Sequence, residues 1–222
     1  MKKYIQYGCG LSCPEGWENF DASPTLVIQK LPLIGYLLKS RLNTFFPDKV
    51  KYGNIIFGLP KIESNTCDGI YCSHILEHLC FNDLRSALKN TFEYLKPSGT
   101  FRLIVPDLET HINIYIENKK NKDINAANKF IRYTLLGQEN RRTGVKGVVD
   151  FLFSNHNHRW MWDFESLSNE LKFVGFTNIK RCEFNDSQDE MFKLVEDKGR
   201  FIEYKESESK RVPALAIECK KQ

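Results

Sequence analysis

The sequence has 222 residues, of which 41% are hydrophobic, 13% aromatic and 27% charged, and its net charge is +4. This composition is that of a folded globular protein and excludes disordered and fibrous classes. The longest apolar stretch, 31–38, has eight residues and contains Pro32 and Gly35, so no transmembrane segment is expected.

The seven cysteines are scattered along the chain, and none belongs to a CxxC pair. This usage is typical of reduced thiols in a cytoplasm rather than of a zinc site or a disulfide framework. The N-terminal lysines are not followed by an apolar segment, which argues against a secretory signal. The sequence therefore predicts a cytoplasmic location, and it gives no indication of the oligomeric state.

Five segments before residue 110 have the length and apolar content of strands: 3–7, 17–22, 54–59, 69–74 and 100–106. The last of these is the most hydrophobic and is apolar on both faces, as a central parallel strand should be. Between the second and third strands, apolar residues have a loose helical spacing that Pro32 interrupts.

Two amphipathic helices are predicted in the middle and second half of the chain. The first covers 82–95, with Asn82 as its N-cap and the sequence Lys-Pro-Ser-Gly as its stop. The second covers 164–174 and ends at Gly175, a residue type that favours the left-handed conformation after a helix.

The alternation of strands and helices predicts an α/β fold with a doubly wound, mostly parallel sheet. The final strands, 177–184 and 213–220, have no clear helix between them, which suggests an antiparallel pair at one edge. Residues 110–160 are mostly polar and begin with helical character, so we expect a helical insertion there.

A short loop, Gly8-Cys9-Gly10, follows the first predicted strand. Glycines let the backbone approach a ligand closely, and exposed N–H groups can bind a carboxylate or phosphate. Asp21 ends the next strand, where it could accept two ribose hydroxyls or, equally, cap the turn before Ser23. A dinucleotide is disfavoured, because the third glycine of GxGxxG is absent and Pro14 opposes a helix there.

Several segments together resemble class I S-adenosylmethionine (SAM)-dependent methyltransferases, and most of all the bacterial type 11 group associated with polysaccharide and cell-surface biosynthesis. They are YGCG…GWENFDASP, GLPKIESNTCDGIYCSHILEHL, LRSALKNTFEYLKPSGTFRLIVPDLE and HRWMWDFESLSNELKFVGF. Their order and spacing cover nearly the whole chain. The resemblance implies one Rossmann-like methyltransferase domain over 1–222, with an antiparallel last strand and 110–160 as a substrate-side insertion or cap.

The resemblance also implies roles for individual residues, with SAM as the cofactor. Gly8, Cys9 and Gly10 match the loop under its methionine part, and Asp21 matches the acid on the ribose hydroxyls. Leu59 matches the residue beside the adenine, while Ser73 and His74 match the floor of the methyl-transfer pocket. Two departures are the small number of glycines and the lack of room for a first helix before Trp17.

His74, Glu77 and His78 have the spacing i, i+3, i+4, which would place them on one face if a helix begins at the strand end. Two imidazoles and a carboxylate can hold a divalent metal. The motif resembles the ExxEH metal ligands of ubiquinone-pathway O-methyltransferases and small-RNA 2′-O-methyltransferases. The alternative, favoured on balance, is that Glu77 and His78 cap or orient a helix without metal.

A second polar cluster contains His156, His158 and Arg159, next to Trp160 and Trp162. A histidine there suits a general base at neutral pH, and the tryptophans suit a flat wall against a sugar ring. The alternative is a solvated loop that its tryptophans anchor to the core.

Asp107 follows the fifth strand at the edge where such sheets bind ligands, so it is a candidate for substrate binding or, alternatively, the N-cap of the next helix. The predicted activity is methylation of a hydroxyl on a sugar or small polar metabolite, with His74, His78, His156 or His158 as the base.

Two other functions remain open on the sequence alone. RNA 2′-O-methylation is suggested by the possible metal triad and by the stretch 117–146, which has eight Lys or Arg and three acidic residues. Few aromatic residues lie in that stretch, which disfavours nucleic acid. The second alternative is a methyltransferase-like scaffold that has lost catalysis, suggested by the short glycine loop.

Overall fold

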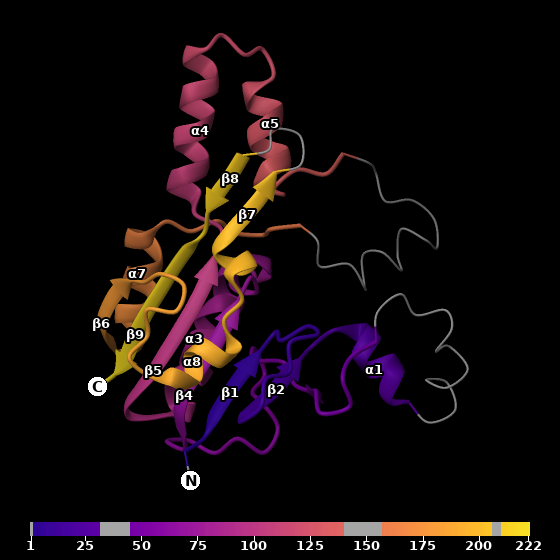
Figure 1. Ribbon diagram of the computed structural model, residues 1–222, viewed down its shortest axis with the longest axis vertical. Coiled ribbons are helices and arrows are strands. Elements are labelled where there is room, and N and C mark those ends of the chain that lie inside the picture. Colours follow the sequence, from indigo (N-terminus) through magenta and orange to yellow (C-terminus); the bar gives the residue numbers. More distant parts are fainter. Residues whose placement is uncertain (1, 32–44, 140–156, 206–209) are drawn as a thin grey trace.

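The computed structural model describes residues 2–31, 45–139, 157–205 and 210–222, which build an α/β fold around a seven-stranded sheet (Figure 1). The strand order is β3-β2-β1-β4-β5-β9-β6. The strands are β1 (Tyr4–Tyr7), β2 (Trp17–Asp21), β3 (Lys51–Tyr52), β4 (Cys67–Ser73), β5 (Leu95–Val105), β6 (Phe176–Arg181) and β9 (Leu215–Lys221).

The strands from β3 to β5 run parallel, whereas β9 is antiparallel to both of its neighbours, β5 and β6. This confirms the predicted doubly wound, mostly parallel sheet with an antiparallel last strand. The last strand enters between two earlier ones, so β6 forms the edge. The carboxyl ends of β1, β2 and β4 meet at one side of the sheet, which is where ligands bind in such folds.

One face of the sheet is covered by helices α3 (Phe81–Tyr94) and α7 (Phe164–Val174). Both helices carry leucines at helical spacing, and these residues are completely buried: Leu84, Leu88, Leu167 and Leu171. They belong to one apolar cluster with strand residues that point to the same face, such as Ile5, Ile70, Phe101 and Ile217. This burial is the main stabilising contact between the helices and the sheet.

The opposite face is covered by a helix from the C-terminal part of the chain, α8 (Glu190–Val195). No helix joins β1 to β2, in agreement with the short connection before Trp17. The Trp17 indole donates to the Met191 carbonyl at 3.1 Å, and Tyr4 donates to Asp189 at 2.6 Å. Thus α8 shields the sheet face that β1 and β2 would otherwise expose.

The predicted strand at 54–59 is wrong. The third strand is β3, only two residues long, and the segment after it forms turns with one isolated bridge between Asn54 and Gly58. The Asn54 side chain accepts a hydrogen bond from the Ile56 N–H at 3.0 Å, and Gly58 has φ +98°. An asparagine that bonds the backbone two residues on competes with a strand.

The two predicted helices are confirmed, with a correction at one end. Helix α7 has the predicted bounds, and Gly175 ends it with φ +115°. Its N-terminus is a capping box in which Asp163 accepts from the Ser166 N–H at 2.8 Å. Helix α3 begins one residue before the expected cap, so Cys80 is its N-cap and not Asn82.

The expected helical insertion begins with α4 (Leu108–Lys120) and α5 (Ala126–Tyr133), which form a hairpin beyond the sheet (Figure 1). Beside it lies the hairpin of β7 (Ile202–Lys205) and β8 (Lys210–Pro213). Helix α1 (Pro24–Lys30) follows β2 and buries Leu26. None of the helices within the described residues has the length and apolar character needed to cross a membrane.

Candidate active site

A cavity of about 410 Å³ opens at the carboxyl ends of β1, β2 and β4. It is lined by residues at the ends of these strands and in the loops that follow them, and by the turn after β3; they include Gly8, Asp21, Gly53–Ile56, His74, Ile75, His78 and Leu79. Its volume lies within the usual range for small-ligand sites.

The glycine loop adopts a conformation that only glycine takes without strain. Gly8 has φ +64° and Gly10 has φ +54°. A Cβ on Gly8 would lie 2.1 Å from Cγ1 of Ile75, whereas a Cβ on Gly10 would meet no atom within 4 Å. The loop therefore lies against the end of β4 because residue 8 has no side chain.

Cys9, between the two glycines, is buried and remains a neutral thiol at physiological pH. Burial, with a smaller contribution from the neighbouring Asp21, raises the pKa of this thiol to about 12. Its role in the site is therefore packing, together with Leu26, Phe46 and Val50.

Asp21 ends β2, lines the cavity and also organises the loops around it. One carboxylate oxygen accepts from the Gly10 N–H at 2.8 Å, and the other accepts from the Ser23 N–H at 2.7 Å. The carboxylate thus caps the turn before Ser23, as the alternative prediction for Asp21 has it, and each oxygen has a further lone pair for a ligand.

A second cavity, of about 540 Å³, lies on the other side of the glycine loop. Gly8 lines both cavities. The side chains of Gln6 and Ser73 also line the second one, and Gln6 Oε1 and Ser73 Oγ are buried with no hydrogen-bond partner in the described part of the chain. Such atoms are suited to binding a polar ligand.

The rim of the second cavity includes Asp197 and Arg200 from the 3₁₀ turn η2 (Lys198–Phe201). The sequence indicated only a polar connection in this region, so these residues were missed. Their local sequence carries no motif, and they reach the cavity only because α8 packs across the sheet.

Leu59 occupies a different position from the one that the resemblance implies. It is 5% exposed, packs in the main apolar cluster, and donates its N–H to the Tyr94 hydroxyl at 2.8 Å. The residues that line the cavity on this side are Gly53–Ile56, from the turn that replaces the predicted strand.

The end of β4 does not continue into an α-helix. The prediction that His74, Glu77 and His78 lie on one face of a helix is therefore wrong. His74 has φ +53°, and residues Leu76–His78 form only a single 3₁₀ turn, η1. A residue in the left-handed region separates the strand from the turn. Glu77 nevertheless lies between the two histidines: His74 Nδ1 is 3.3 Å and His78 Nε2 is 3.9 Å from Glu77 Oε1.

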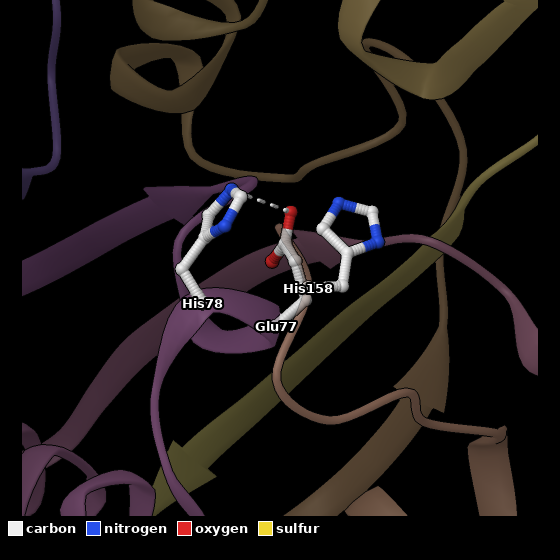
Figure 2. A group of neighbouring side chains, drawn as sticks. All are labelled: Glu77, His78 and His158. Atoms are coloured by element: carbon white, nitrogen blue, oxygen red, sulfur yellow. Dashed lines mark ion pairs between the residues drawn. The ribbon is translucent and has the colours of Figure 1, made fainter. Parts of the chain in front are cut away.

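The end of the 110–160 segment is attached to this turn by main-chain hydrogen bonds. The N–H groups of Arg159 and Trp160 both donate to the Glu77 carbonyl, at 2.7 Å and 3.2 Å. The attachment brings His158 to Glu77 and His78, and possible ligand atoms of the three residues all lie within 4.8 Å of one another. Figure 2 shows the Glu77 carboxylate between the two rings.

The predicted substrate residues divide into exposed and structural ones. Trp160 is 44% exposed, whereas Trp162 is 2% exposed and stacks on Phe81 in the core. Asp107 is buried and caps α4, where it accepts from the Glu109 N–H and the Thr110 hydroxyl. Arg159 reaches Cys80 Sγ at 3.2 Å.

His156 lies outside the described residues. Of the other predicted catalytic residues, His74, His78 and His158 gather around Glu77, as described above.

Comparison with known proteins agrees with this geometry. Residues 14–181 match the family described as methyltransferase domain. No curated protein matches the sequence. Among solved structures, a SAM-dependent methyltransferase of Archaeoglobus fulgidus has 17% identity and a TM-score of 0.51, covering 99% of this chain and 86% of that one. A SAM-dependent methyltransferase of Thermotoga maritima has 16% identity and a TM-score of 0.50, covering 100% and 83%.

A sheet of this order, with its cavity at the carboxyl ends of β1, β2 and β4, defines a class I methyltransferase fold. The chain belongs to the methyltransferase domain family. It is a SAM-dependent methyltransferase, and S-adenosylmethionine is its cofactor.

Proposed function

We propose that the protein transfers a methyl group to a hydroxyl oxygen of a sugar or a small polar metabolite, as the resemblance to enzymes of polysaccharide biosynthesis implies. The observation that carries this proposal is the pair of His74 and the buried Glu77 carboxylate beside the cavity. A neutral hydroxyl is a weak nucleophile, so its methylation needs a group that takes its proton.

The cofactor fits across the two cavities that share Gly8. When bound, it supplies a methyl group activated by a sulfonium. In this proposal Asp21 binds the ribose hydroxyls, and Gly53–Ile56 line the adenine side in place of Leu59. The amino-acid end lies under Gly8, Cys9 and Gly10, where Ser73 Oγ and Gln6 Oε1 are buried without hydrogen-bond partners in the described residues.

The hydrogen bonds of His74 make it the base in this proposal. Its Nε2 lies 2.8 Å from the Arg200 carbonyl, and because a carbonyl only accepts, Nε2 carries the proton of this bond. Nδ1 is then the nitrogen that takes the hydroxyl proton. The imidazolium formed has the Glu77 carboxylate at 3.3 Å, which stabilises its charge.

The acceptor side of the site is formed, in this proposal, by the end of the 110–160 insertion. Trp160 offers an exposed ring for a sugar face, and Arg159 offers hydrogen-bond donors beside it. Trp162 and Asp107 are structural in this proposal rather than contacts of the acceptor, because Trp162 is in the core and Asp107 caps α4.

A small acceptor is favoured over RNA by the charges of the helical hairpin. Two basic residues of α5 are already paired, Lys129 with Asp123 at 2.9 Å and Arg132 with Glu139 at 2.6 Å. Each pair reduces the positive charge offered to a phosphate backbone. Lys119, Lys120 and Lys122 complete the described basic residues of the stretch, and the three at 141, 142 and 146 lie outside the described residues.

The proposal is tested by release of S-adenosylhomocysteine on incubation with SAM and a panel of monosaccharides, oligosaccharides, polyols and one RNA oligonucleotide. Turnover with a hydroxylated small molecule is expected. Turnover with RNA and with none of the small molecules would support RNA 2′-O-methylation instead. Failure of the folded protein to bind SAM in a calorimetric titration would support a methyltransferase-like scaffold that has lost catalysis.

His74→Gln examines the base directly. We expect kcat to fall by about 10²–10⁴-fold, the usual contribution of a positioned base. The amide keeps the size and polarity of the ring edge, so the affinity for SAM should change little. A variant with wild-type kcat would contradict the assignment of His74, and the same variant titrated with SAM provides the control for folding.

A further inference from the structure

We propose that Glu77, His78 and His158 form a binding site for a divalent transition-metal ion. Their possible ligand atoms all lie within 4.8 Å of one another (Figure 2). The set differs from the one that sequence spacing suggested, because His158 takes the place of His74. The site itself does not depend on the identity of the methyl acceptor.

The Glu77 carboxylate is the first reason to expect a cation. Its side chain is 1% exposed, and neither oxygen accepts a hydrogen bond from the described residues. An ionised carboxylate withdrawn from water needs either hydrogen-bond donors or a positive charge. A metal ion between the carboxylate and the two imidazoles supplies that charge.

The second reason is the orientation of His78. Its Nδ1 lies 3.2 Å from the Asn157 carbonyl, which can only accept, so Nδ1 carries a proton. In the neutral ring Nε2 then has a lone pair, and Nε2 is the nitrogen 3.9 Å from Glu77 Oε1. Metal-binding histidines are commonly held in this way, with the other ring nitrogen donating to a carbonyl.

The third reason is that the backbone holds the three residues together without the metal. Arg159 and Trp160 donate their N–H groups to the Glu77 carbonyl, which attaches the segment that carries His158 to η1. The rings of His78 and His158 have centroids 5.1 Å apart. Ligands on a tetrahedral ion at about 2.1 Å lie roughly 3.4 Å apart, so the present separations of up to 4.8 Å exceed that spacing by no more than about 1.4 Å.

Two imidazoles and one carboxylate favour Zn²⁺, Co²⁺ or Mn²⁺ over Mg²⁺, which prefers oxygen ligands. Three protein ligands leave a coordination position open, and His78 also lines the cofactor cavity. An ion here would bind the acceptor hydroxyl and make its proton easier for His74 to remove. That use of the ion rests on the proposed function.

The experiment is a titration of the metal-free protein with Co²⁺, followed by its visible absorption, and with Zn²⁺ and Mg²⁺ by calorimetry, in the absence of SAM and acceptor. One equivalent of Co²⁺ or Zn²⁺ should bind, and Mg²⁺ should bind far more weakly. Glu77→Gln and His158→Gln should weaken metal binding by at least roughly 100-fold. Removing a residue that only orients a ligand already costs up to about 100-fold in metal affinity, and removing the ligand itself should cost more.

Two variants serve as controls for this titration. His74→Gln should keep the metal affinity within threefold, since His74 lies outside the set. Glu170→Gln removes another buried carboxylate, one that pairs with Arg85 on α3, and should also leave metal binding unchanged. Circular dichroism of each variant checks that it is folded.

The outcomes separate this proposal from the proposed function. Absence of Co²⁺ and Zn²⁺ binding by the folded protein overturns the metal site. Methylation measured in the presence of a chelator then tests the proposed function independently of any metal. An equal loss of metal affinity in His74→Gln and His158→Gln would also overturn the proposed ligand set of Glu77, His78 and His158. Metal binding in a protein that methylates no hydroxyl would leave the site in place and reject the proposed acceptor.

Discussion

Gly8 shows how one missing side chain determines the shape of the cavity at the ends of β1, β2 and β4. Its backbone is in the left-handed region, and a Cβ there would lie 2.1 Å from Ile75 Cγ1. Gly10 shares the left-handed backbone, but the space beside it is open. The two glycines thus look alike in sequence and differ in what surrounds them.

We therefore expect different costs when each of these glycines is replaced by alanine. Gly10→Ala should lower the free energy of unfolding by about 1 kcal/mol, the strain of a left-handed alanine. Gly8→Ala should lower it by about 3 kcal/mol, because overlap with Ile75 is added. Urea denaturation of both variants measures the difference, and equal losses would show that the loop moves freely away from β4.

At the scale of elements, local capping determines where α7 begins and ends. Asp163 and Ser166 cap each other's backbone at its start, and Gly175 ends it in the left-handed conformation. Hydrogen bonds from Ser166, side chain first and then backbone, hold the pKa of the Asp163 carboxyl below its usual value. The same helix then buries Leu167 and Leu171 on the sheet.

Asp163→Ala should destabilise the protein by about 1 kcal/mol at pH 7, the typical value of an N-cap. A carboxylate whose pKa is lowered by folding stabilises the protein above its unfolded pKa, about 3.9, and loses this effect as the pH falls through the folded value. The difference between variant and wild type should therefore shrink near pH 3.

The control for this prediction is Asn125→Ala. Asn125 is the N-cap of α5, but its side chain makes no capping hydrogen bond. Thermal or urea unfolding should show almost no change for that variant. A loss as large as that of Asp163→Ala would mean that the capping bonds do not account for the stability.

At the scale of the whole molecule, Arg102 links the C-terminal segment to the sheet by ion pairs. It lies on β5 with 1% exposure and pairs with Glu218 on β9 at 2.8 Å and with Glu196 after α8 at 2.6 Å. Burial raises the pKa of Glu218, but the hydrogen bonds and charges of Arg102 and Lys180 together lower it by more, so the net shift is downward. These contacts keep α8 over β1 and β2 and keep Arg200 at the second cavity.

Arg102→Met should lower the free energy of unfolding by about 3–5 kcal/mol, because Glu196 would stay buried without its arginine and Glu218 would keep only Lys180 as its cation. The matched control is Arg85→Met on α3. Arg85 also pairs with a glutamate, Glu170, but its side chain is 43% exposed. That variant should lose much less stability than Arg102→Met, because solvent screens the exposed guanidinium. Comparable losses in urea denaturation would argue against a special role for the buried arginine.

The sequence by itself predicted the mostly parallel sheet, its antiparallel last strand and the bounds of α7, but it misplaced the third strand. These features depend on signals that lie close together along the chain, such as alternating apolar residues and helix caps. The class of enzyme and its cofactor came from the resemblance of whole segments to a known family. The sequence also selected His74, Glu77 and His78 as neighbours, although the helix assumed for them was replaced by a single 3₁₀ turn.

Only the tertiary structure decided which other groups join them. His78 lies 79 residues before Asn157, and the hydrogen bonds that link their segments are made largely by main-chain atoms, which every residue type carries. For the same reason the sequence did not reveal that α8 covers β1 and β2 or that Arg200 reaches a cavity. Such contacts depend on how buried surfaces pack across the whole molecule, and no local pattern records that.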